Sequence, residues 1–408
     1  MVIDTGDTTW MLISTGLVMI MTPALGFFEA GLIRGKNSLS VIMQTFSGLA
    51  ILSTLWFVLG FTLVFSPSQG GFIGGFDWLF YNNVPFNESL DYSPTIPGVT
   101  FATYQMMFAV ITPLLITGAF AERVRWNAFV VFIVVWSIFI YYPLAHWVWG
   151  RGWLAEMGVF DFAGGIVIHT SAGLGSLAAA LVLGRRKNFG PDIMVPHNIP
   201  LAVIGAALLW IGWFGFNAGS ALASGSLAAN TLLVTHIASC TSALVWIGLS
   251  WKRAGKPSST AAINGAISGL AGVTPASGFI SAQNSFLLGI VLGFASYYAI
   301  LLLKEHLKID DALDVSSVHG VTGIVGALAI GIIASTLINP AGPDGLLYGN
   351  PMQLAVQAFG VAVAAALGFG GTLIIMKIID ATIGLKVREE EEDIGLDITQ
   401  HAERAYVS

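Results

Sequence analysis

Eleven apolar segments, each close to the length of a membrane-crossing helix, follow one another along this chain of 408 residues. A helix needs about 20 mostly apolar residues to cross the hydrocarbon core of a bilayer. The segments lie near 8–33, 38–66, 98–120, 127–146, 162–184, 199–220, 227–251, 260–280, 284–304, 315–338 and 351–379. The eighth is the weakest, because it is short of large apolar side chains and rich in Gly, Ala and Ser. We therefore predict an all-α integral membrane protein with eleven transmembrane helices, whose membrane domain covers residues 1–379.

Composition supports a membrane protein and excludes several other classes. Only 10% of the residues are charged, against about 25% in soluble proteins. The 48 glycines suit close helix packing in lipid. The single Cys240 excludes an intrachain disulfide framework, and the short Lys/Arg clusters carry no nucleic-acid-binding signature. No basic residue precedes Arg34, so the first segment lacks the basic region of a signal peptide and is expected to be retained.

The basic residues predict the orientation of the chain. All of the 17 Lys and Arg residues except Arg151 lie at the ends of odd-numbered segments, directly after them, or in the C-terminal tail. The positive-inside rule then places the N-terminus outside and the C-terminus inside. The loop at 67–97 is expected outside, and residues 380–408 are expected to form a cytoplasmic regulatory tail. Its acidic run at 389–393 is typical of a solvated linker, and residues 394–406 mix apolar and polar side chains as a docking segment does.

Two intramembrane histidines occur in matching frames. The pattern D-x7-H-x3-G is found at 161–173 around His169 and at 311–323 around His319. Each histidine lies eight residues after the aspartate that begins its motif, a depth of about 12 Å at a rise of about 1.5 Å per residue. The two approach the middle of a core about 30 Å thick from opposite faces. This pattern predicts an inverted repeat of segments 1–5 and 6–10, with the eleventh as an addition.

The histidine pair admits several chemical roles. An ionisable residue inside a membrane is a candidate functional group, although a lone histidine there more often joins neighbouring helices by a hydrogen bond. Metal binding needs three or four ligands, and neither histidine has a carboxylate or cysteine at suitable spacing. Haem ligation by two histidines is possible, but haem cytochromes usually show several such pairs or a CxxCH motif. A proton relay or polar strip in an apolar pore fits better, without metal or cofactor.

Other segments carry aromatic and small polar residues together. Tyr104 and Phe108 lie one helical turn apart on one face, and residues 210–220 place Trp and Phe beside Asn, Gly and Ser. Trp149 lies at the outer end of its segment. Taken singly, such residues usually anchor helices at the membrane interface or pack between them.

Together with the histidine frames, these segments resemble the ammonium transporter family (Amt/Mep, distantly related to Rh proteins), and in particular its Amt branch. The motifs that carry the resemblance are FAERVR at 120–125, DFAGG at 161–165, WFGFNAG at 213–219, both histidine frames, and GLD at 395–397. The resemblance covers essentially the whole chain. It implies eleven spans, a pseudo-twofold axis and a homotrimer in the plasma membrane with one pore per subunit.

The resemblance also implies an outer recruitment site for ammonium, formed by Trp149, Ser220 and the ring of Tyr104. The family commonly has Phe where this chain has Tyr104. Asp161 resembles the structural carboxylate near that site, and we expect it to cap its helix rather than bind substrate, because a helix N-terminus favours a carboxylate.

Below the recruitment site, Phe108 and Phe216 resemble a stacked pair that closes the pore, and His169 and His319 resemble its twin-histidine lining. Moving a bare cation through such an apolar pore costs tens of kcal/mol by Born estimates. We therefore expect ammonium to give up its proton and ammonia to cross, with or without that proton. Potassium cannot do this and would be excluded.

The tail resembles the family's regulatory tail, which contacts a neighbouring subunit and serves as, or lies near, a docking surface for PII-type nitrogen-signalling proteins. An alternative is an ammonium sensor that signals through this tail; the chain shows no kinase-like or cyclase-like domain. A third reading is an Rh-type channel for gas or small neutral solutes, against which Trp149 and the DFAGG motif weigh. An enzyme is not expected, because no nucleophile–base pair or metal set is apparent.

Overall fold

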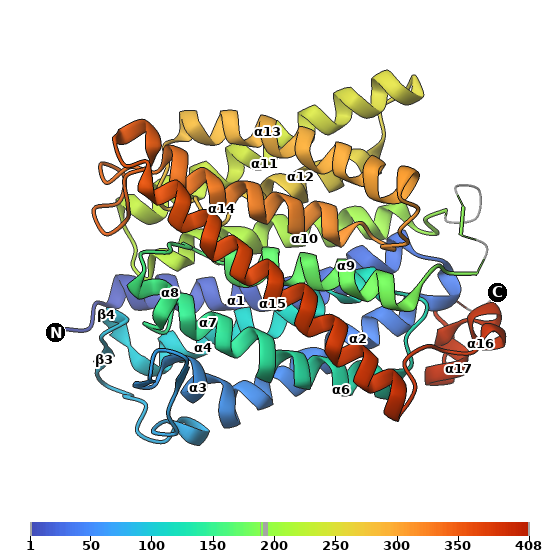
Figure 1. The fold of residues 1–408 in the computed structure, drawn as a ribbon, viewed down its shortest axis with the longest axis horizontal. Helices are drawn as coiled ribbons and strands as arrows, with labels where there is room; N and C mark the ends of the chain where they lie inside the picture. The colour runs from blue at the N-terminus through green and yellow to red at the C-terminus, as the bar shows by residue number, and fades with distance from the viewer. Residues whose placement is uncertain (1, 188, 191–194, 407–408) are drawn as a thin grey trace.

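The computed structural model describes residues 2–187, 189–190 and 195–406, which form a bundle of long helices lying side by side (Figure 1). Within these residues, ten helical segments are long and apolar enough to cross a membrane. The first five are α1 (Thr5–Leu32); α2 (Ser38–Leu55) continued by η2 (Trp56–Gly60) and α3 (Phe61–Phe65); α4 (Gly98–Leu114) with α5 (Thr117–Phe120); α6 (Trp126–Trp136) with η4 (Ser137–Tyr141) and α7 (Tyr142–Val148); and η5 (Gly165–Thr170) with α9 (Ser171–Leu183). The others are α10 (Ile199–Trp213) with η6 (Phe214–Ala218) and η7 (Gly219–Ala221); α11 (Ser226–Ala254); α13 (Ala282–Ile300) with η8 (Leu301–His306); η9 (Ser316–Val321) with α14 (Thr322–Ile333); and α15 (Met352–Thr382).

Ten of the eleven predicted segments are confirmed as helices of membrane length, and the eighth differs. Helix α12 (Ser259–Val273) has 15 residues, and the chain continues as turns to Phe279. Its Gly, Ala and Ser residues favour close packing over helix length, and it packs against both α11 and α13, which also contact each other. By helix length alone, therefore, the structure does not confirm eleven crossings.

The two ends of the bundle differ in structure. The N-terminus lies at one end, here called the N-terminal end, together with the short helix α8 (Trp153–Glu156) and the paired strands β3 (Ser89–Leu90) and β4 (Ser93–Pro97) (Figure 1). A second short hairpin, β1 (Ser68–Gln69) with β2 (Ile73–Gly74), belongs to the same loop. The tail helices α16 (Glu389–Ile394) and α17 (Leu396–His401) lie at the opposite end, here called the tail end.

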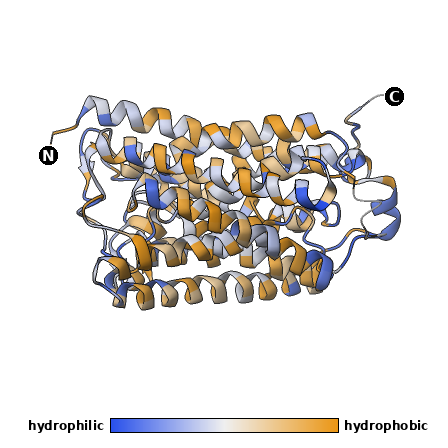
Figure 2. Cartoon of the chain, turned by 90° about the horizontal axis from the view of Figure 1, so that it is seen from above, coloured by the Kyte–Doolittle hydropathy of each residue, from blue (hydrophilic) through white to orange (hydrophobic). Residues whose placement is uncertain are grey.

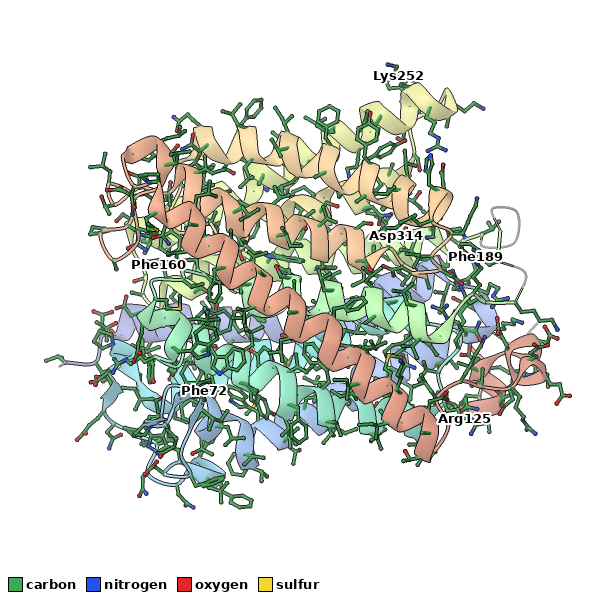
Figure 3. The ribbon with its side chains drawn as sticks, in the orientation of Figure 1. Phe72, Arg125, Phe160, Phe189, Lys252 and Asp314 are labelled. Atoms are coloured by element: carbon green, nitrogen blue, oxygen red, sulfur yellow. The ribbon has the colours of Figure 1, made fainter. Side chains whose placement is uncertain are left out.

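The distribution of polar residues follows the same axis. Hydrophobic residues run along the helices, and hydrophilic ones gather at the two ends (Figure 2). Arg125 and Lys252 both lie at the tail end, whereas Phe72 and Phe160 lie toward the N-terminal end (Figure 3). Several helices begin with a side chain that accepts from a free backbone N–H of the first turn, as in Asp4 for α1 and Asn198 for α10. These caps set the starts of α1 at Thr5 and of α10 at Ile199, compared with predicted starts near 8 and 199.

The two predicted repeats meet through corresponding elements. Helices α1 and α10, the first of each half, cross so closely that a Cβ on Gly205 would lie 2.3 Å from the backbone nitrogen of Phe28. Helix α9 of the first half meets η9 of the second half in the same way, because a Cβ on Gly173 would lie 2.2 Å from the Cα of Gly320. Only glycine allows backbones to approach this closely. The crossing of α9 and η9 brings both histidine motifs together.

Candidate functional site

A cavity of about 310 Å³, here called the outer cavity, lies in the half of the bundle nearer the N-terminal end. Trp149, Asp161 and Ser220 line it, as does Phe108. The Trp149 indole Nε1 donates to the Asp161 carbonyl oxygen (2.9 Å), and Ser220 Oγ donates to the Phe216 carbonyl oxygen (2.9 Å). These bonds fix an indole face and a hydroxyl at the same cavity. The structure therefore brings together most of the residues expected for an outer recruitment site.

Tyr104 occupies a different position from the one expected. Tyr104 is not one of the described residues that line the outer cavity. Its side chain is fully buried. Its hydroxyl donates to the carbonyl oxygen of Gly215 (2.8 Å) or Phe216 (3.0 Å) and lies 3.3 Å from Ser220 Oγ. A phenylalanine could not make these bonds, and they hold the tyrosine behind the cavity wall. Tyr104 thus supports Ser220 and Phe216 from behind.

Two phenylalanines separate this outer cavity from a second cavity deeper in the bundle. The ring centroids of Phe108 and Phe216 are 4.4 Å apart at an interplanar angle of 40°. Phe108 lines the outer cavity, and Phe216 lines the inner one. Phe108 comes from α4 and Phe216 from η6, so the barrier depends on helices from both halves of the chain.

The inner cavity is narrow and mostly apolar. Its volume of about 30 Å³ has room for about two water-sized molecules, since one needs at least about 10–15 Å³ on this measure. Its polar side chains are those of Glu29, His169, Asn264 and His319, and the remainder of the lining is apolar. A hydrated ion does not fit this space, whereas ammonia or water does.

His169 and His319 meet inside this cavity. Their Nδ1 atoms are 3.2 Å apart, and the ring centroids are separated by 5.2 Å at an interplanar angle of 28°. One Nδ1 must donate and the other accept, so the two neutral rings are opposite tautomers that share one proton between them. Trp213 stacks on His169 at 5.6 Å and holds its ring in place. One additional proton would make one ring an imidazolium, and a further one would place two positive charges at hydrogen-bond distance in an apolar space.

Matching local structure positions the two histidines. Each lies in a widened helical turn, η5 for His169 and η9 for His319, which passes directly into an α-helix. The final glycine of each motif packs on the other motif: a Cβ on Gly323 would lie 2.8 Å from the Cβ of His169. Such widened turns are rare and are frequent at functional sites. The matched frames of the sequence therefore correspond to matched conformations.

Asp161 caps the helix that carries His169. Its carboxylate accepts from the backbone N–H groups of four consecutive residues at 2.7–3.0 Å, namely Gly164, Gly165, Ile166 and Val167. The carboxylate is buried and is the partner of the unpaired donors at the start of η5. Asp311 has the corresponding place before η9, where one oxygen accepts from Ser316 N at 2.7 Å. Both aspartates orient the turns that present the histidines.

No group of three or more His, Cys, Asp or Glu residues within the described part of the chain is placed to hold a metal ion. The candidate site therefore consists of two cavities, a pair of tilted aromatic rings between them and a pair of imidazoles. A model of the Ammonium Transporter Family matches residues 9–406 of this sequence.

The chain belongs to the ammonium transporter family.

Relatives of known sequence and structure agree with this assignment. Ammonium transporter 1 of Dictyostelium discoideum is 55% identical over 407 residues, covering 99% of this chain and 88% of that protein. The crystal structure of Candida albicans Mep2 is similar with a TM-score of 0.89 at 34% identity, covering 95% of this chain and 88% of the Mep2 chain. A solved structure described as a sensor Amt protein has a TM-score of 0.89 at 28% identity, covering 97% of this chain and 98% of that one. This protein is thus a multi-pass membrane protein of the ammonium transporter family.

A buried ionic cluster joins the helix ends at the tail end of this transporter. Arg186 pairs with Asp310 (Nη2–Oδ1 2.7 Å) and with Glu122 (Nη1–Oε2 2.8 Å), and Arg34 also pairs with Glu122 (2.9 Å). These residues follow the first, third, fifth and ninth predicted segments, so the cluster collects the ends of four helices. Burial alone raises the pKa of Glu122, but the hydrogen bond from Arg34 and the charge of Arg186 hold that pKa below its usual value. The pKa of Asp310 is lowered in the same way, because the hydrogen bonds and charge of Arg186 outweigh burial.

The tail packs onto this cluster. Glu392 is only 1% exposed, and its Oε1 accepts from Lys187 N (2.7 Å) and lies 3.6 Å from Arg34 Nη2. The interpretation of 389–393 as a solvated linker was therefore wrong for Glu392, because the partly buried guanidinium of Arg34 and the backbone N–H of Lys187 offset the desolvation of its carboxylate. Asp397 Oδ1 accepts from Ser40 N at 2.9 Å. The last two tail positions, 407–408, lie outside the described residues.

One glycine explains how the tail can approach so closely. Gly395 has φ of 109°, and a Cβ there would lie 2.6 Å from the carbonyl oxygen of Lys36. Only glycine fits both the backbone conformation and the space. The Gly-Leu-Asp string thus has a structural role, placing Leu396 and Asp397 against the start of α2.

Glu29 lines the inner cavity beside both histidines, although no sequence motif singled it out. The rule that selects the histidines applies equally to this acidic residue within the first apolar segment. Trp213, which stacks on His169, was likewise not predicted as a site residue. No spacing along the chain could have paired Trp213 with His169, because they lie on different helices, far apart in the sequence.

Proposed function

We propose that this transporter recruits ammonium at the outer cavity, removes its proton at the phenylalanine pair, and conducts ammonia through the inner cavity along His169 and His319. The observation that carries this proposal is the direct Nδ1–Nδ1 contact of 3.2 Å between two imidazoles in an otherwise apolar cavity. That cavity lies immediately beyond a closed pair of aromatic rings. An uncharged, ammonia-sized molecule is the species that such a space accommodates.

The outer cavity supplies weak cation binding. An indole face on Trp149 and a hydroxyl on Ser220 attract ammonium by cation–π contact and hydrogen bonding, each contributing about 0.5–2 kcal/mol. Asp161 lies in the same lining, but its carboxylate oxygens are engaged by backbone N–H groups, so its negative charge is already shared. Such a site concentrates ammonium at the gate and releases it readily. Tyr104 serves it indirectly, by holding Ser220.

The proton must leave at the aromatic pair, since no charged side chain follows until the histidines. Phe108 and Phe216 offer no group that replaces the hydration of a cation, and desolvation of an unpaired charge costs tens of kcal/mol by Born estimates. Ammonium can meet this barrier by giving up a proton, which potassium cannot do. Selectivity for ammonium over potassium therefore depends on the ability to lose a proton rather than on the size of the ion.

Beyond the barrier, the histidine pair provides a polar strip. Each neutral imidazole presents one donor and one acceptor, so ammonia can exchange hydrogen bonds while it passes. The shared proton between the Nδ1 atoms also gives a path by which a proton can cross the pair. Transport with the proton is electrogenic, and transport without it is electroneutral.

The same proposal places the protein in the plasma membrane with eleven membrane crossings. Its N-terminus then lies outside the cell, and its tail lies in the cytoplasm. The ion pair between Arg253, at the end of α11, and Glu305, at the end of α13, supports the eleventh crossing (2.8 Å). Two helices that end at the same face and run in the same direction require the intervening 259–280 to cross back. The basic residues near Arg34, Arg186 and Lys252 support the cytoplasmic assignment of the tail end.

We also propose a homotrimer whose tails carry the docking surface for a PII-type signalling protein. His236 in α11 is exposed on the outside of the single chain, and an imidazole facing lipid is unfavourable, so a neighbouring subunit is expected to cover it. The tail exposes Ile394 and Ile398 (55% and 42%) at the tail end, where a cytoplasmic partner can reach them. Residues 1–379 then form the membrane domain and 380–408 the regulatory tail.

The test is a current measurement on supported membranes with purified protein in liposomes, using ammonium jumps and potassium jumps as the control. The wild-type protein should give a saturable ammonium signal, as a current or as a change in internal pH, and no potassium signal. His169→Ala should abolish it while leaving a folded trimer. His236→Ala is the matched control, because it removes an intramembrane imidazole outside both cavities. Intact ammonium transport in His169→Ala would refute the twin-histidine mechanism.

A sensor is the second candidate, favoured by the likeness of this chain to the structure described as a sensor Amt protein. A sensor would bind ammonium and change the exposure of its tail without sustained flux. Ammonium-dependent protection of the tail from proteolysis, combined with the absence of both current and internal pH change, would favour it over transport.

A further inference from the structure

Glu29 is an acidic side chain in the membrane-crossing helix α1 that the mechanism above does not use. It lies four residues before the C-cap Ile33, is 1% exposed, and lines the inner cavity with both histidines. Because α1 runs from the N-terminal end to the tail end, Glu29 lies between the histidine pair and the tail end of the pathway. Glu29, His169 and His319 are the only titratable side chains of the described residues that line this cavity.

The surroundings of Glu29 leave its charge uncompensated. Among the described residues it forms no ion pair, whereas Glu122 nearby in the fold has two arginines. Its carboxyl oxygens each lie 3.0 Å from Thr117 Oγ1, and the backbone of α5 is close, since a Cβ on Gly118 would lie 3.0 Å from Glu29 Oε1. An unpaired carboxylate in a buried apolar site is strongly unfavourable. Glu29 must therefore hold a proton or face a cation that enters the cavity.

The hydrogen bonds of the Thr117 hydroxyl indicate that Glu29 holds a proton at rest. It has one proton and three acceptors within reach, of which the Leu114 carbonyl oxygen is the nearest at 2.5 Å. When that carbonyl takes the proton, the contact between Thr117 and Glu29 requires a proton on the carboxyl group. A carboxylic acid placed beside the cavity is then ready to donate to a base that arrives there, and ammonia is such a base.

We propose that Glu29 is the inner proton acceptor and donor of this pathway, taking the proton relayed by the histidine pair and returning it to ammonia that leaves toward the tail end. The inference rests on the proposed conduction of ammonia together with its proton. Glu29 holds a proton at rest and donates it to ammonia that has passed the histidine pair, so ammonium leaves toward the tail end and a carboxylate remains. The proton that the incoming ammonium gave to the imidazole nearer the gate is relayed through the Nδ1–Nδ1 contact to this carboxylate and restores the carboxylic acid. One ammonium and one positive charge cross per cycle.

The geometry supports each transfer. The inner cavity has room for about two water-sized molecules, which can link an imidazole nitrogen to the carboxyl group. His169 Nε2 is buried without a hydrogen-bond partner among the described atoms and is free to exchange a proton on the cavity side. Once ammonia is protonated, the carboxylate faces the new cation and offsets the cost of its charge. Without such a group, ammonia would regain its proton only in bulk solvent.

The test compares Glu29→Gln with Glu29→Asp in liposomes by recording both the ammonium current and the change in internal pH. Glutamine keeps the shape of the side chain and its hydrogen bond with Thr117 but carries no exchangeable acid proton. We expect Glu29→Gln to lose about 100-fold of the current, as for loss of a general acid–base group, while ammonia conduction seen as an internal pH change persists. Glu29→Asp keeps the carboxyl group and should retain an intermediate current.

The outcomes separate this inference from the proposed function. A full current in Glu29→Gln would overturn the role of Glu29 and leave the transporter intact. A wild-type protein that changes internal pH without any current would also overturn it, because no proton then crosses the histidine pair. A wild-type protein with neither signal would refute transport itself.

A second measurement tests the role of Glu29 if the Glu29→Gln protein does not fold. Infrared difference spectra of the wild type and Glu29→Asp should show a protonated carboxylic acid C=O band that shifts with the substitution and responds to ammonium. The absence of a band that shifts between the two proteins would overturn the inference.

Discussion

Replacing Asp161 by alanine removes the acceptor of four consecutive backbone N–H groups at the start of η5. A buried donor left without a partner costs about 1–3 kcal/mol, so four such donors together cost about 4–12 kcal/mol. The lower part of this range applies where water from the outer cavity can reach them, since Asp161 lines that cavity. Even the lower part is comparable with the whole stability of many domains, at about 5–15 kcal/mol. We expect a large loss of folded protein.

Asp311→Ala is the matched control within the same molecule. Asp311 stands at the corresponding place in the second motif, but only one backbone donor, Ser316 N, bonds to its carboxylate. Its loss should therefore cost about 1–3 kcal/mol. Asp161→Asn is an intermediate variant, because one carboxamide oxygen can retain two of the four hydrogen bonds. The expected order of stability is wild type, Asp311→Ala, Asp161→Asn and Asp161→Ala.

Thermal unfolding of the purified proteins in detergent, followed by tryptophan fluorescence, measures this order, and size-exclusion chromatography measures folded yield. The fall in Tm for Asp161→Ala should be several times that for Asp311→Ala. Equal shifts in the two variants would refute the argument from hydrogen-bond number. A stable Asp161→Ala protein with a raised KM for ammonium would show instead that the carboxylate binds substrate.

Three further predictions concern the outer cavity, the ionic cluster and the tail. Combining Trp149→Leu with Ser220→Ala should raise the apparent KM for ammonium about fivefold or more, since two contacts of about 0.5–2 kcal/mol are lost; an unchanged KM in flux assays would contradict the recruitment site. The pKa values of Glu122 and Asp310 are lowered on folding, so their contribution to stability is full above their unfolded values and is lost as pH falls. Tm should therefore drop between about pH 5 and pH 3, and it should drop less steeply in Glu122→Gln than in the wild type. Equal slopes of Tm against pH in the two proteins would argue against a stabilising role of the cluster. Asp397→Ala removes the acceptor of Ser40 N and should speed limited proteolysis of the tail, whereas unchanged cleavage would show that other contacts hold it.

Much of the fold is readable from local sequence. An apolar segment in a bilayer must satisfy its backbone hydrogen bonds internally, so segment length and hydropathy predict the helices directly. The weak eighth segment was recognisable as such, and α12 is indeed the short one. The proposed crossing at 259–280 rests on the Arg253–Glu305 pair, which joins the ends of α11 and α13, and that information is not local.

The candidate site, like the fold, is partly predictable from local sequence and partly decided by helix packing. The paired frames around His169 and His319 predict two buried imidazoles at similar depth, because helical rise converts residue number into distance. Their contact, by contrast, depends on Gly173 and Gly320 allowing two backbones to cross. Tyr104 shows what local sequence cannot predict. Its hydroxyl donates to carbonyl oxygens of η6, more than a hundred residues away, and the side chain therefore lies outside the cavity lining.

What the sequence determined by itself is whatever depends on near neighbours along the chain: membrane-length helices, the capping role of Asp161, the clustering of basic residues after alternate segments, and the repeated histidine motif. What only the tertiary structure decided is which side chains share a cavity and which charges find partners. Glu392 looks solvated in its acidic run but is buried against Arg34, and Glu29 looks like one polar residue in an apolar helix but joins the histidines. The physical reason is that desolvation and pairing of a charge depend on groups brought close by helix packing, which can lie anywhere in the chain.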